Sequence, residues 1–497
     1  MSQIAADLRR VASSSGLYAL ANLLQRGLSF ILLPVYTRFL ETPEYGVLEL
    51  LNGLSAILFG LLLLGMPSAL QKVFHRDCDT EEEQKRVLPT ALLLDLPALA
   101  LGSGLLFIFA EPVGAWLLGE PGYGPAVQLT VAAVVASSLV AIVLSAFRAR
   151  EQAVAYAMLN FAQFGLGMAL NVVLVVWLRM GIYGVLWGNL VAAAATLPAG
   201  LWIARRDIEL RIDRRLVAPL LHFGLLVVPT AITGWVITMA DRYVLRFFGS
   251  LEEVAIYSVG YKIGMILQMG LVWPFQLAWP AVAFSISRRA GHEATYARVL
   301  TYLVFGLALG VVGLSLMARA GLGAFAGPSY AEAHRVVPWV ALAYAFAGIQ
   351  FCLSPSVHIR GKTKYLALFS VGGTIVNLGL NLLLVPSYGM MGATWATTAS
   401  YAVLMLATAI LSLRIHPLPL ETGRLLKITA VSLAVLALGL SVDPHSGLFA
   451  SLTWQAFLAL ALLPALLLAV GFLRPGERRR IHDLFRRLTE WTRENRV

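Results

Sequence analysis

The chain has 497 residues, of which 59% are hydrophobic and only 13% are charged, and its mean hydropathy is +0.76. Soluble domains hold about 45–50% apolar and about 25% charged residues, so the composition excludes a soluble globular protein and predicts lipid as the solvent. The formal net charge of +11 does not indicate nucleic-acid binding, because the Lys and Arg residues lie in short loops between apolar runs. Two cysteines and eight histidines without paired spacing give no disulfide framework or metal motif, so no cofactor is expected.

Apolar segments predict an all-α membrane protein with about fourteen transmembrane helices, since about 20 apolar residues cross the hydrocarbon core. The predicted spans lie near residues 14–38, 45–71, 87–110, 125–147, 153–178, 182–204, 216–240, 254–285, 296–318, 334–357, 365–386, 390–413, 424–442 and 450–473. The second and eighth spans are long, and we expect bends at Pro67, Pro274 and Pro280.

The spans predict five parts of the chain. They are an N-lobe of six spans (1–204), a basic linker (205–215), a C-lobe of six spans (216–413), an extra helix pair (414–473) and an amphipathic tail (474–497). The tail carries one apolar stripe between arginines and is expected to lie along the inner leaflet.

The distribution of positive charge predicts the orientation of the chain. If the N-terminus is cytoplasmic, 30 of the 38 Lys and Arg residues fall on the cytoplasmic side, six in outer loops and two inside spans. This bias predicts that both termini are cytoplasmic and supports an even number of spans.

The first six spans resemble the next six at an offset of about 208 residues. GIYGVLWG from Gly181 matches GMMGATWA from Gly389, and TRFL at Arg38 matches LRFF at Arg246. Two six-span units share one membrane orientation, so their pseudo-twofold axis is expected along the membrane normal, with a cleft between the lobes.

Three segments carry a resemblance to a known family. LLPVYTRFLETPEYGVLEL, ADRYVLRFFGSLEEVAIYSVGYKIG and NLLLVPSYGMMGATWATTASY resemble the polysaccharide-transport (Wzx-like) branch of the MOP flippase superfamily, which also contains MATE drug exporters and lipid II flippases. The resemblance implies movement of an undecaprenyl-diphosphate-linked oligosaccharide from the cytoplasmic to the outer leaflet of a bacterial cytoplasmic membrane. The implied partners are this polyprenyl-diphosphate-linked glycan and membrane lipids.

Two cations inside predicted spans are the candidate substrate-binding residues. Arg26 precedes Arg38 by roughly 18 Å of helix and Lys262 follows Glu252 by roughly 15 Å, which places both near the midplane. A charge at that depth faces a wet cavity or a partner, and cations suit phosphate oxygens. Polar neighbours extend the candidate site: Asn22, Ser29, Tyr261 and Gln268. The alternative is that each cation only pairs with a carboxylate or carbonyl between helices.

Acidic residues near spans are candidates for gating or coupling. Asp241 can pair with Arg38, Arg242 or Arg246 to latch an outer gate, or it can form a solvated pair at the interface. Glu49 has the same two interpretations. Asp95 lies eight residues into the third span and can take a coupling proton, or it can be paired or reach the inner surface. The sequence does not choose between H⁺ and Na⁺ as a coupling ion.

Other functions fit less well. An enzyme needs clustered carboxylates or histidines on one loop, which the loops lack, so no catalytic activity is expected. A MATE-type multidrug exporter shares the fold but uses buried carboxylates, whereas the midplane charges here are positive. A lipid II flippase would also have fourteen spans and a cationic cavity, so this alternative stays open. A major-facilitator transporter lacks support because the loop QKVFHRDCDTEEEQKR has no Gly-Asp-Arg-Gly-Arg-type signature.

Overall fold

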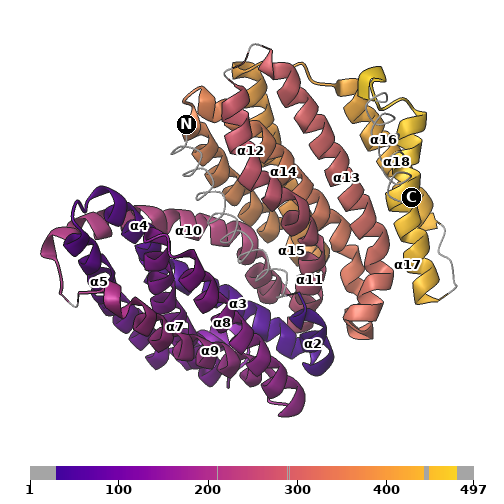
Figure 1. Ribbon diagram of the computed structural model, residues 1–497. Helices are drawn as coiled ribbons and strands as arrows, with labels where there is room; N and C mark the ends of the chain where they lie inside the picture. The colour runs from indigo at the N-terminus through magenta and orange to yellow at the C-terminus, as the bar shows by residue number, and fades with distance from the viewer. Residues whose placement is uncertain (1–29, 210, 288, 290, 442–446, 478–497) are drawn as a thin grey trace, which may run out of the picture. The chain divides into compact units, whose positions relative to one another are not determined.

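The computed structural model of the chain describes residues 30–209, 211–287, 289, 291–441 and 447–477. Within these ranges the secondary structure is helical and contains no strand (Figure 1). The helices before the midpoint are α2 (Leu32–Phe39), α3 (Thr42–Leu62), α4 (Met66–Arg76), α5 (Glu81–Ile108), α6 (Ala110–Leu118), α7 (Gly124–Ala149), α8 (Ala153–Val172), η1 (Val173–Trp177), α9 (Gly181–Ala204), η2 (Arg205–Asp207) and α10 (Arg214–Phe248). The later helices are α11 (Leu251–Gly264), η3 (Gln268–Val272), α12 (Trp273–Ile286), α13 (His292–Phe325), η4 (Pro328–Arg335), α14 (Val337–Ile359), α15 (Thr363–Ile415), α16 (Thr422–Ser441), α17 (Leu448–Phe457), η5 (Leu458–Leu462) and α18 (Leu463–Ala469).

The chain divides into two compact units. Unit 1 comprises Met1–Lys262, Phe325–Val336 and Ala367–Val403, and unit 2 comprises Ile263–Ala324, Val337–Leu366 and Leu404–Val497. These units follow the density of internal contacts, and the six-plus-six lobes expected from the repeat stay a prediction.

Unit 1 is built around α7. This helix packs against α4, α5, α6 and α9, and α9 packs on α8 as well (Figure 1). The core between these helices is aliphatic and aromatic and includes Met66, Leu70, Ile142 and Phe147, each almost fully buried. Such packing fixes the positions of α3 and α10, which both contact this bundle.

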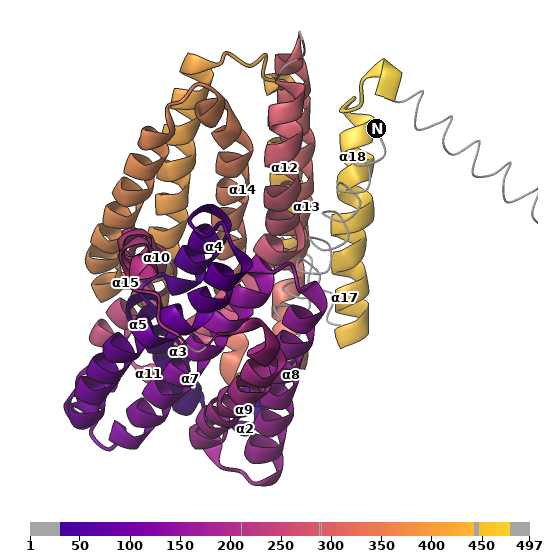
Figure 2. The same ribbon diagram turned by 60° about the vertical axis from the view of Figure 1, so that its left-hand side comes forward.

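Unit 2 contains two aliphatic cores. One holds Trp279, Leu303 and Leu307, where α12 packs against α14. The other holds Val312 of α13 together with Ile428 and Leu458 from the C-terminal helices. Figure 2 shows α17 and α18 as one continuous rod, joined through η5, at the C-terminal side of unit 2. Within unit 2, the C-terminal helices therefore pack against α13.

Twelve of the described helices are long and apolar enough to cross a membrane. One of them, α15, runs for 53 residues but is interrupted by non-helical backbone at Gly389, so it corresponds to the two predicted spans 365–386 and 390–413. Most of the predicted first span, 14–38, lies outside the described residues, and its end forms α2. Counting α15 as two spans and adding the first span accounts for the predicted fourteen. The chain is an all-α integral membrane protein.

The predicted bend near Pro67 is a break between α3 and α4. Leu64 and Gly65 adopt positive φ angles of 45° and 66°, and Pro67 lies in the first turn of α4, where its missing N–H leaves no helical bond unmade. A Cβ at Gly65 would clash with the carbonyl oxygen of Gly224 on α10. Glycine therefore permits both the turn and the close approach of α4 to α10.

At Pro274 the structure shows a change of helix type, and Pro280 lies inside the continuous helix α12; the bends expected at these two residues stay predictions. The π-helix η3, Gln268–Val272, ends immediately before α12, in which Pro274 occupies the first turn. A proline cannot donate to the preceding turn, and a π-turn is a common way to accommodate that missing bond.

Two glycines related by the internal repeat share one local structure. Gly181 and Gly389 have φ angles of 57° and 51°. A carboxylate faces each: a Cβ on Gly181 would lie 2.7 Å from Oε1 of Glu44, and one on Gly389 would clash with Oε1 of Glu253. Glu253 accepts a hydrogen bond from the backbone N–H of Met390 at 2.7 Å. Because Glu44 and Glu253 are each the third residue of their helices, the two halves repeat a carboxylate–glycine contact as well as a sequence pattern.

Large apolar side chains remain exposed over the outside of the helices. Trp116, Leu383 and Phe449 are 80%, 72% and 84% exposed. A water-soluble surface avoids such groups when they are contiguous, whereas hydrocarbon accepts them. The exposed surface is thus suited to lipid.

Candidate functional site

Three of the predicted binding residues lie outside the described residues. Asn22, Arg26 and Ser29 belong to residues 1–29, so their roles stay predictions. The other predicted cation, Lys262, is described, and it belongs to a group of charged and phenolic side chains within unit 1. We call this group the unit 1 charge network; it consists of Tyr45, Glu49, Asp241, Arg242, Tyr257, Tyr261 and Lys262.

Lys262 is held by two groups on α3. Its Nζ donates to Oε1 of Glu49 at 2.6 Å and to the hydroxyl of Tyr45 at 2.8 Å. Glu49 and Tyr45 are one helical turn apart, so both reach the same cation on α11. The Lys262 side chain is 29% exposed, while that of Glu49 is only 4% exposed. Lys262 is therefore the member of this pair that a ligand can reach. Its pair with Glu49 is the carboxylate pairing that the sequence analysis gave as the alternative to phosphate binding.

Arg242 and Asp241 form the second pair of the network. Nη1 of Arg242 donates to Oδ1 of Asp241 at 3.0 Å and to the backbone oxygen of Thr238 at 2.9 Å, and its Nε lies 3.9 Å from Oε2 of Glu49. Both side chains of the pair are buried. Glu49 thus lies between two cations, and the network carries two acids and two bases with no net charge.

Aromatic groups complete the network. The Tyr257 hydroxyl donates to Oδ2 of Asp241, and the Tyr261 ring lies 4.6 Å from the Arg242 guanidinium carbon. Stacking on an aromatic face suits a guanidinium that has lost its water. Tyr330 of η4 packs edge-on against Tyr45, with ring centroids 6.0 Å apart, and burial raises the pKa of Tyr330 to about 12. The α3 end of the network is accordingly enclosed by phenols.

The predicted pairing of Asp241 with an arginine is formed with Arg242. Asp241 pairs with its neighbour Arg242 in the interior, not in a solvated interfacial pair. Arg246 donates to the backbone oxygens of Leu118, at the end of α6, and of Gly249. Arg38 is exposed in the last turn of α2. The interior position of Asp241 and Arg242 follows from α10, which continues to Phe248 instead of ending near residue 240.

Asp95 is completely buried on α5, and neither carboxylate oxygen has a hydrogen-bond partner among the described residues. The two alternatives to a coupling role were that Asp95 is paired or that it reaches the inner surface. Among the described residues Asp95 does neither. An ionised carboxylate without donors costs several kcal/mol in an apolar interior, and a proton on the group removes that cost. Asp95 is therefore suited to carrying a proton.

Gln268 belongs to unit 2 and opens the π-helix η3. Its side-chain oxygen is buried without a hydrogen-bond partner in the described part of the chain. π-turns often occur at functional positions, so the predicted role of Gln268 stays a prediction.

Sequence reasoning missed Tyr45 and Tyr257 as site residues. Tyr45 lies four residues before Glu49, and Tyr257 lies five residues before Lys262. A search for phenols within one or two turns of intramembrane charges would have found both, because a buried hydroxyl needs a partner. Arg242 was considered only as a partner of Asp241 at an outer gate, because the end of its span was placed too early.

Comparison with known proteins gives a family and a fold. The family described as polysaccharide biosynthesis protein matches residues 11–285, which is more than half of the chain. No characterised protein sequence matches.

Several solved structures share the fold. A lipid II flippase MurJ in an inward closed conformation superposes with a TM-score of 0.72 at 16% identity, covering 90% of this chain and 97% of that chain. An inward-facing MATE multidrug-resistance transporter of the MOP superfamily gives 0.64 at 15% identity, covering 80% and 94%. The Vibrio cholerae MATE transporter VcmN in its bent form gives 0.52 at 16% identity, covering 82% and 97%. The chain therefore belongs to the polysaccharide biosynthesis protein family, and its fold is that of the lipid II flippase and the MATE transporters.

Proposed function

We propose that this protein is a flippase that moves an undecaprenyl-diphosphate-linked oligosaccharide from the cytoplasmic to the outer leaflet of a bacterial cytoplasmic membrane by alternating access. Both chain ends are assigned to the cytoplasm in this proposal. The observation that carries it is the partly exposed Lys262, which terminates a buried charge network in a chain of the polysaccharide biosynthesis family.

The chemistry of Lys262 suits a diphosphate. Its ammonium group is already paired with Glu49 and Tyr45, so it carries no uncompensated charge in the absence of substrate. A diphosphate can replace Glu49 as the partner, because phosphate oxygens form strong charge-assisted hydrogen bonds with Lys. Glu49 then remains opposite Arg242, 3.9 Å away, and is not left alone in the interior. Arg26 is the second proposed phosphate ligand.

Transport needs a drive as well as a binding site. Moving negative charge outward across an inside-negative potential is favourable by about 2.3 kcal/mol per charge per 100 mV. A proton carried by Asp95 would add to this drive, since that carboxylate is buried without a hydrogen-bond donor in the described structure. We assign Asp95, and not the paired Glu49 or Asp241, as the coupling residue.

The proposal is tested by flipping in proteoliposomes. The purified chain is reconstituted with a fluorescent undecaprenyl-diphosphate oligosaccharide, and a membrane-impermeant quencher reports the leaflet. The wild-type chain should increase transbilayer movement of this lipid over empty vesicles. Equal movement with and without protein, under an applied potential and a pH gradient, would contradict the proposal.

A double variant separates substrate binding from simple pairing. Lys262→Met leaves Glu49 with one cation fewer, whereas Lys262→Met with Glu49→Gln removes both charges together. If Lys262 only neutralises Glu49, the double variant regains flipping. If Lys262 binds the diphosphate, the double variant folds but stays at least about 10-fold slower than wild type. Lys72→Met, which breaks the partly exposed pair of Lys72 with Asp77 at the end of α4, is the matched control and should flip normally.

Two other substrates remain candidates for the same fold. The match to a lipid II flippase over 97% of that chain favours lipid II as the nearest alternative, and lipid II is also a polyprenyl diphosphate. The unpaired, buried Asp95 is the observation that favours a cation-coupled drug exporter. Lipid II in the flipping assay and ethidium efflux from the same vesicles distinguish these alternatives.

A further inference from the structure

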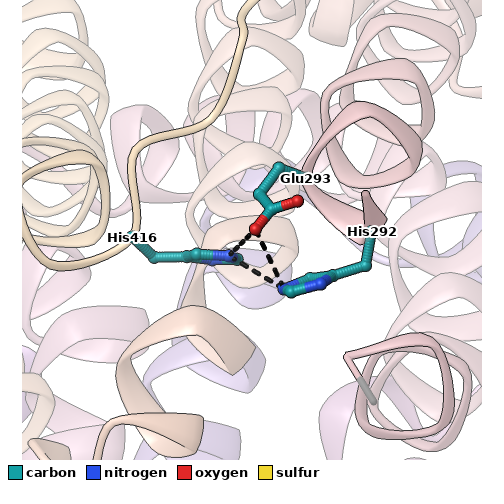
Figure 3. Close-up of side chains that lie close together, drawn as sticks. All are labelled: His292, Glu293 and His416. Atoms are coloured by element: carbon teal, nitrogen blue, oxygen red, sulfur yellow. Dashed lines mark hydrogen bonds and ion pairs between the residues drawn. The ribbon is translucent and has the colours of Figure 1, made fainter. Parts of the chain in front are cut away.

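Three metal-ligating side chains meet at one end of unit 2. His292 and Glu293 begin α13, and His416 follows the last residue of α15, 124 positions after His292 (Figure 3). Their ligand atoms lie within 4.8 Å of one another. Nε2 of His292 is 3.1 Å from Nε2 of His416, and Oε1 of Glu293 is 3.7 Å and 4.0 Å from these two nitrogens. The transport mechanism described above uses none of the three.

The hydrogen bonds around the imidazoles direct lone pairs inward. Nδ1 of His292 lies 2.8 Å from the backbone oxygen of Arg289, which only accepts, so this nitrogen carries the proton. In the neutral ring Nε2 then has its lone pair free for the cluster. Nδ1 of His416 faces the Ser356 hydroxyl at 3.1 Å, which can accept its proton in the same way. Two lone pairs facing each other at 3.1 Å repel unless a proton or a metal ion lies between them.

The surroundings hold the two rings in place. The two imidazole planes are inclined by 25° with centroids 5.1 Å apart, and the Tyr296 ring packs edge-on against both. The Tyr296 hydroxyl donates to the backbone oxygen of Ala283 at 2.7 Å. His416 is buried, while the Glu293 side chain is 38% exposed. The cluster is therefore pre-organised on one side and accessible to an ion on the other, which is how outer hydrogen bonds and packing orient metal ligands.

We propose that His292, Glu293 and His416 bind one Zn²⁺ or a similar borderline divalent cation, with water in the fourth position. In a tetrahedral zinc site with bonds of about 2.0–2.1 Å, ligand atoms lie about 3.3 Å apart. The separations of 3.1, 3.7 and 4.0 Å reach this spacing if the ligand atoms move by up to about 0.7 Å relative to one another. Ca²⁺ and Mg²⁺ need more oxygen ligands, so the two imidazoles select the zinc class.

The metal would join two segments that are far apart in the sequence. It ties the start of α13, directly after the connection from α12, to the end of α15. Binding energy at such a site stabilises the folded form in which the ligands are assembled. The cation is thus a structural tie within unit 2, independent of the lipid that is flipped.

The test uses the full-length chain in detergent, with any polyhistidine tag removed and bound metal stripped by a chelator. Zn²⁺ is titrated in competition with a chromophoric chelator, and thermal unfolding is followed with and without Zn²⁺. We expect one site per chain and a higher unfolding temperature with Zn²⁺. His292→Ala and His416→Ala should each weaken binding by more than about 100-fold, and Glu293→Gln by about 10-fold. His358→Ala, an exposed histidine of unit 2, is the control and should bind as wild type does.

Two results of the Zn²⁺ titration would overturn the proposal. One is the absence of a saturable Zn²⁺ site in the wild-type chain, and the other is wild-type affinity in a monodisperse double variant lacking both histidines. Co²⁺ spectroscopy uses the wild-type chain alone, so its result does not depend on whether the variants fold. Intense visible absorption is expected from a tetrahedral site, and the weak absorption of octahedral aqueous Co²⁺ would equally refute the assignment.

Discussion

Neutralising Glu49 should destabilise the protein more than any change to an exposed acid, because Glu49 lies between two cations. The carboxylate is 2.6 Å from Nζ of Lys262 and 3.9 Å from Nε of Arg242, and its side chain is only 4% exposed. Removing one partner of a buried pair costs about 3–5 kcal/mol. Lys262 keeps Tyr45 as a partner and is partly exposed, so we expect Glu49→Gln to cost about 3 kcal/mol.

The coupling between Glu49 and Lys262 is measured with a double-mutant cycle. The free energy of unfolding is obtained from denaturing-detergent titrations of wild type, Glu49→Gln, Lys262→Met and the double variant. Removing both partners leaves no uncompensated charge, so the double variant should cost about 1–3 kcal/mol less than the sum of the single variants. The partly exposed Lys72–Asp77 pair, at 3.7 Å, serves as the control and should show a coupling below about 0.5 kcal/mol. Additive effects at Glu49 and Lys262 would refute the reasoning.

Further predictions concern the repeated glycine and the unpaired acid. Gly389→Ala should cost at least about 2 kcal/mol of unfolding free energy, since it adds positive-φ strain and a clash with Glu253, whereas Gly327→Ala, with φ of 81° but open space, should cost only about 1 kcal/mol. Equal losses would show that the Glu253 contact contributes nothing. Asp95→Asn should change stability by less than about 1 kcal/mol, because no partner loses a bond, while Asp241→Asn, tested alongside, should cost about 3 kcal/mol. In proteoliposomes Asp95→Asn should abolish the effect of a pH gradient on flipping, and an undiminished effect would remove Asp95 from the coupling scheme.

The positions of most spans could be predicted because a segment that crosses the hydrocarbon core must be apolar over about 20 residues, and hydropathy measures this apolar character. The break near Pro67 was also predictable, since proline removes a backbone donor, whereas Pro280 lies inside the continuous helix α12. Helix ends were less accurate. The span predicted to end near residue 240 continues to Phe248, because a helix that leaves the hydrocarbon need not stop there and hydropathy records only its apolar part.

The candidate site could be predicted only in part. A single intramembrane charge is visible in the sequence, so Lys262, Glu49 and Asp95 could all be singled out. Which charges meet could not be predicted, since Lys262 and Glu49 are 213 residues apart and their contact depends on how α3 packs against α11. The same applies to His292 and His416, whose separation of 124 residues resembles no metal motif.

The central claim, that Lys262 binds the phosphates of the lipid carrier, is tested most directly by measuring lipid binding to the purified chain. Native mass spectrometry can compare undecaprenyl diphosphate and uncharged undecaprenol on wild type and on the Lys262→Met, Glu49→Gln double variant. We predict that the wild-type chain prefers the diphosphate and that the double variant loses at least about 10-fold in affinity for it while binding undecaprenol unchanged. Equal diphosphate affinity in the two proteins would contradict the assignment of Lys262 to the headgroup.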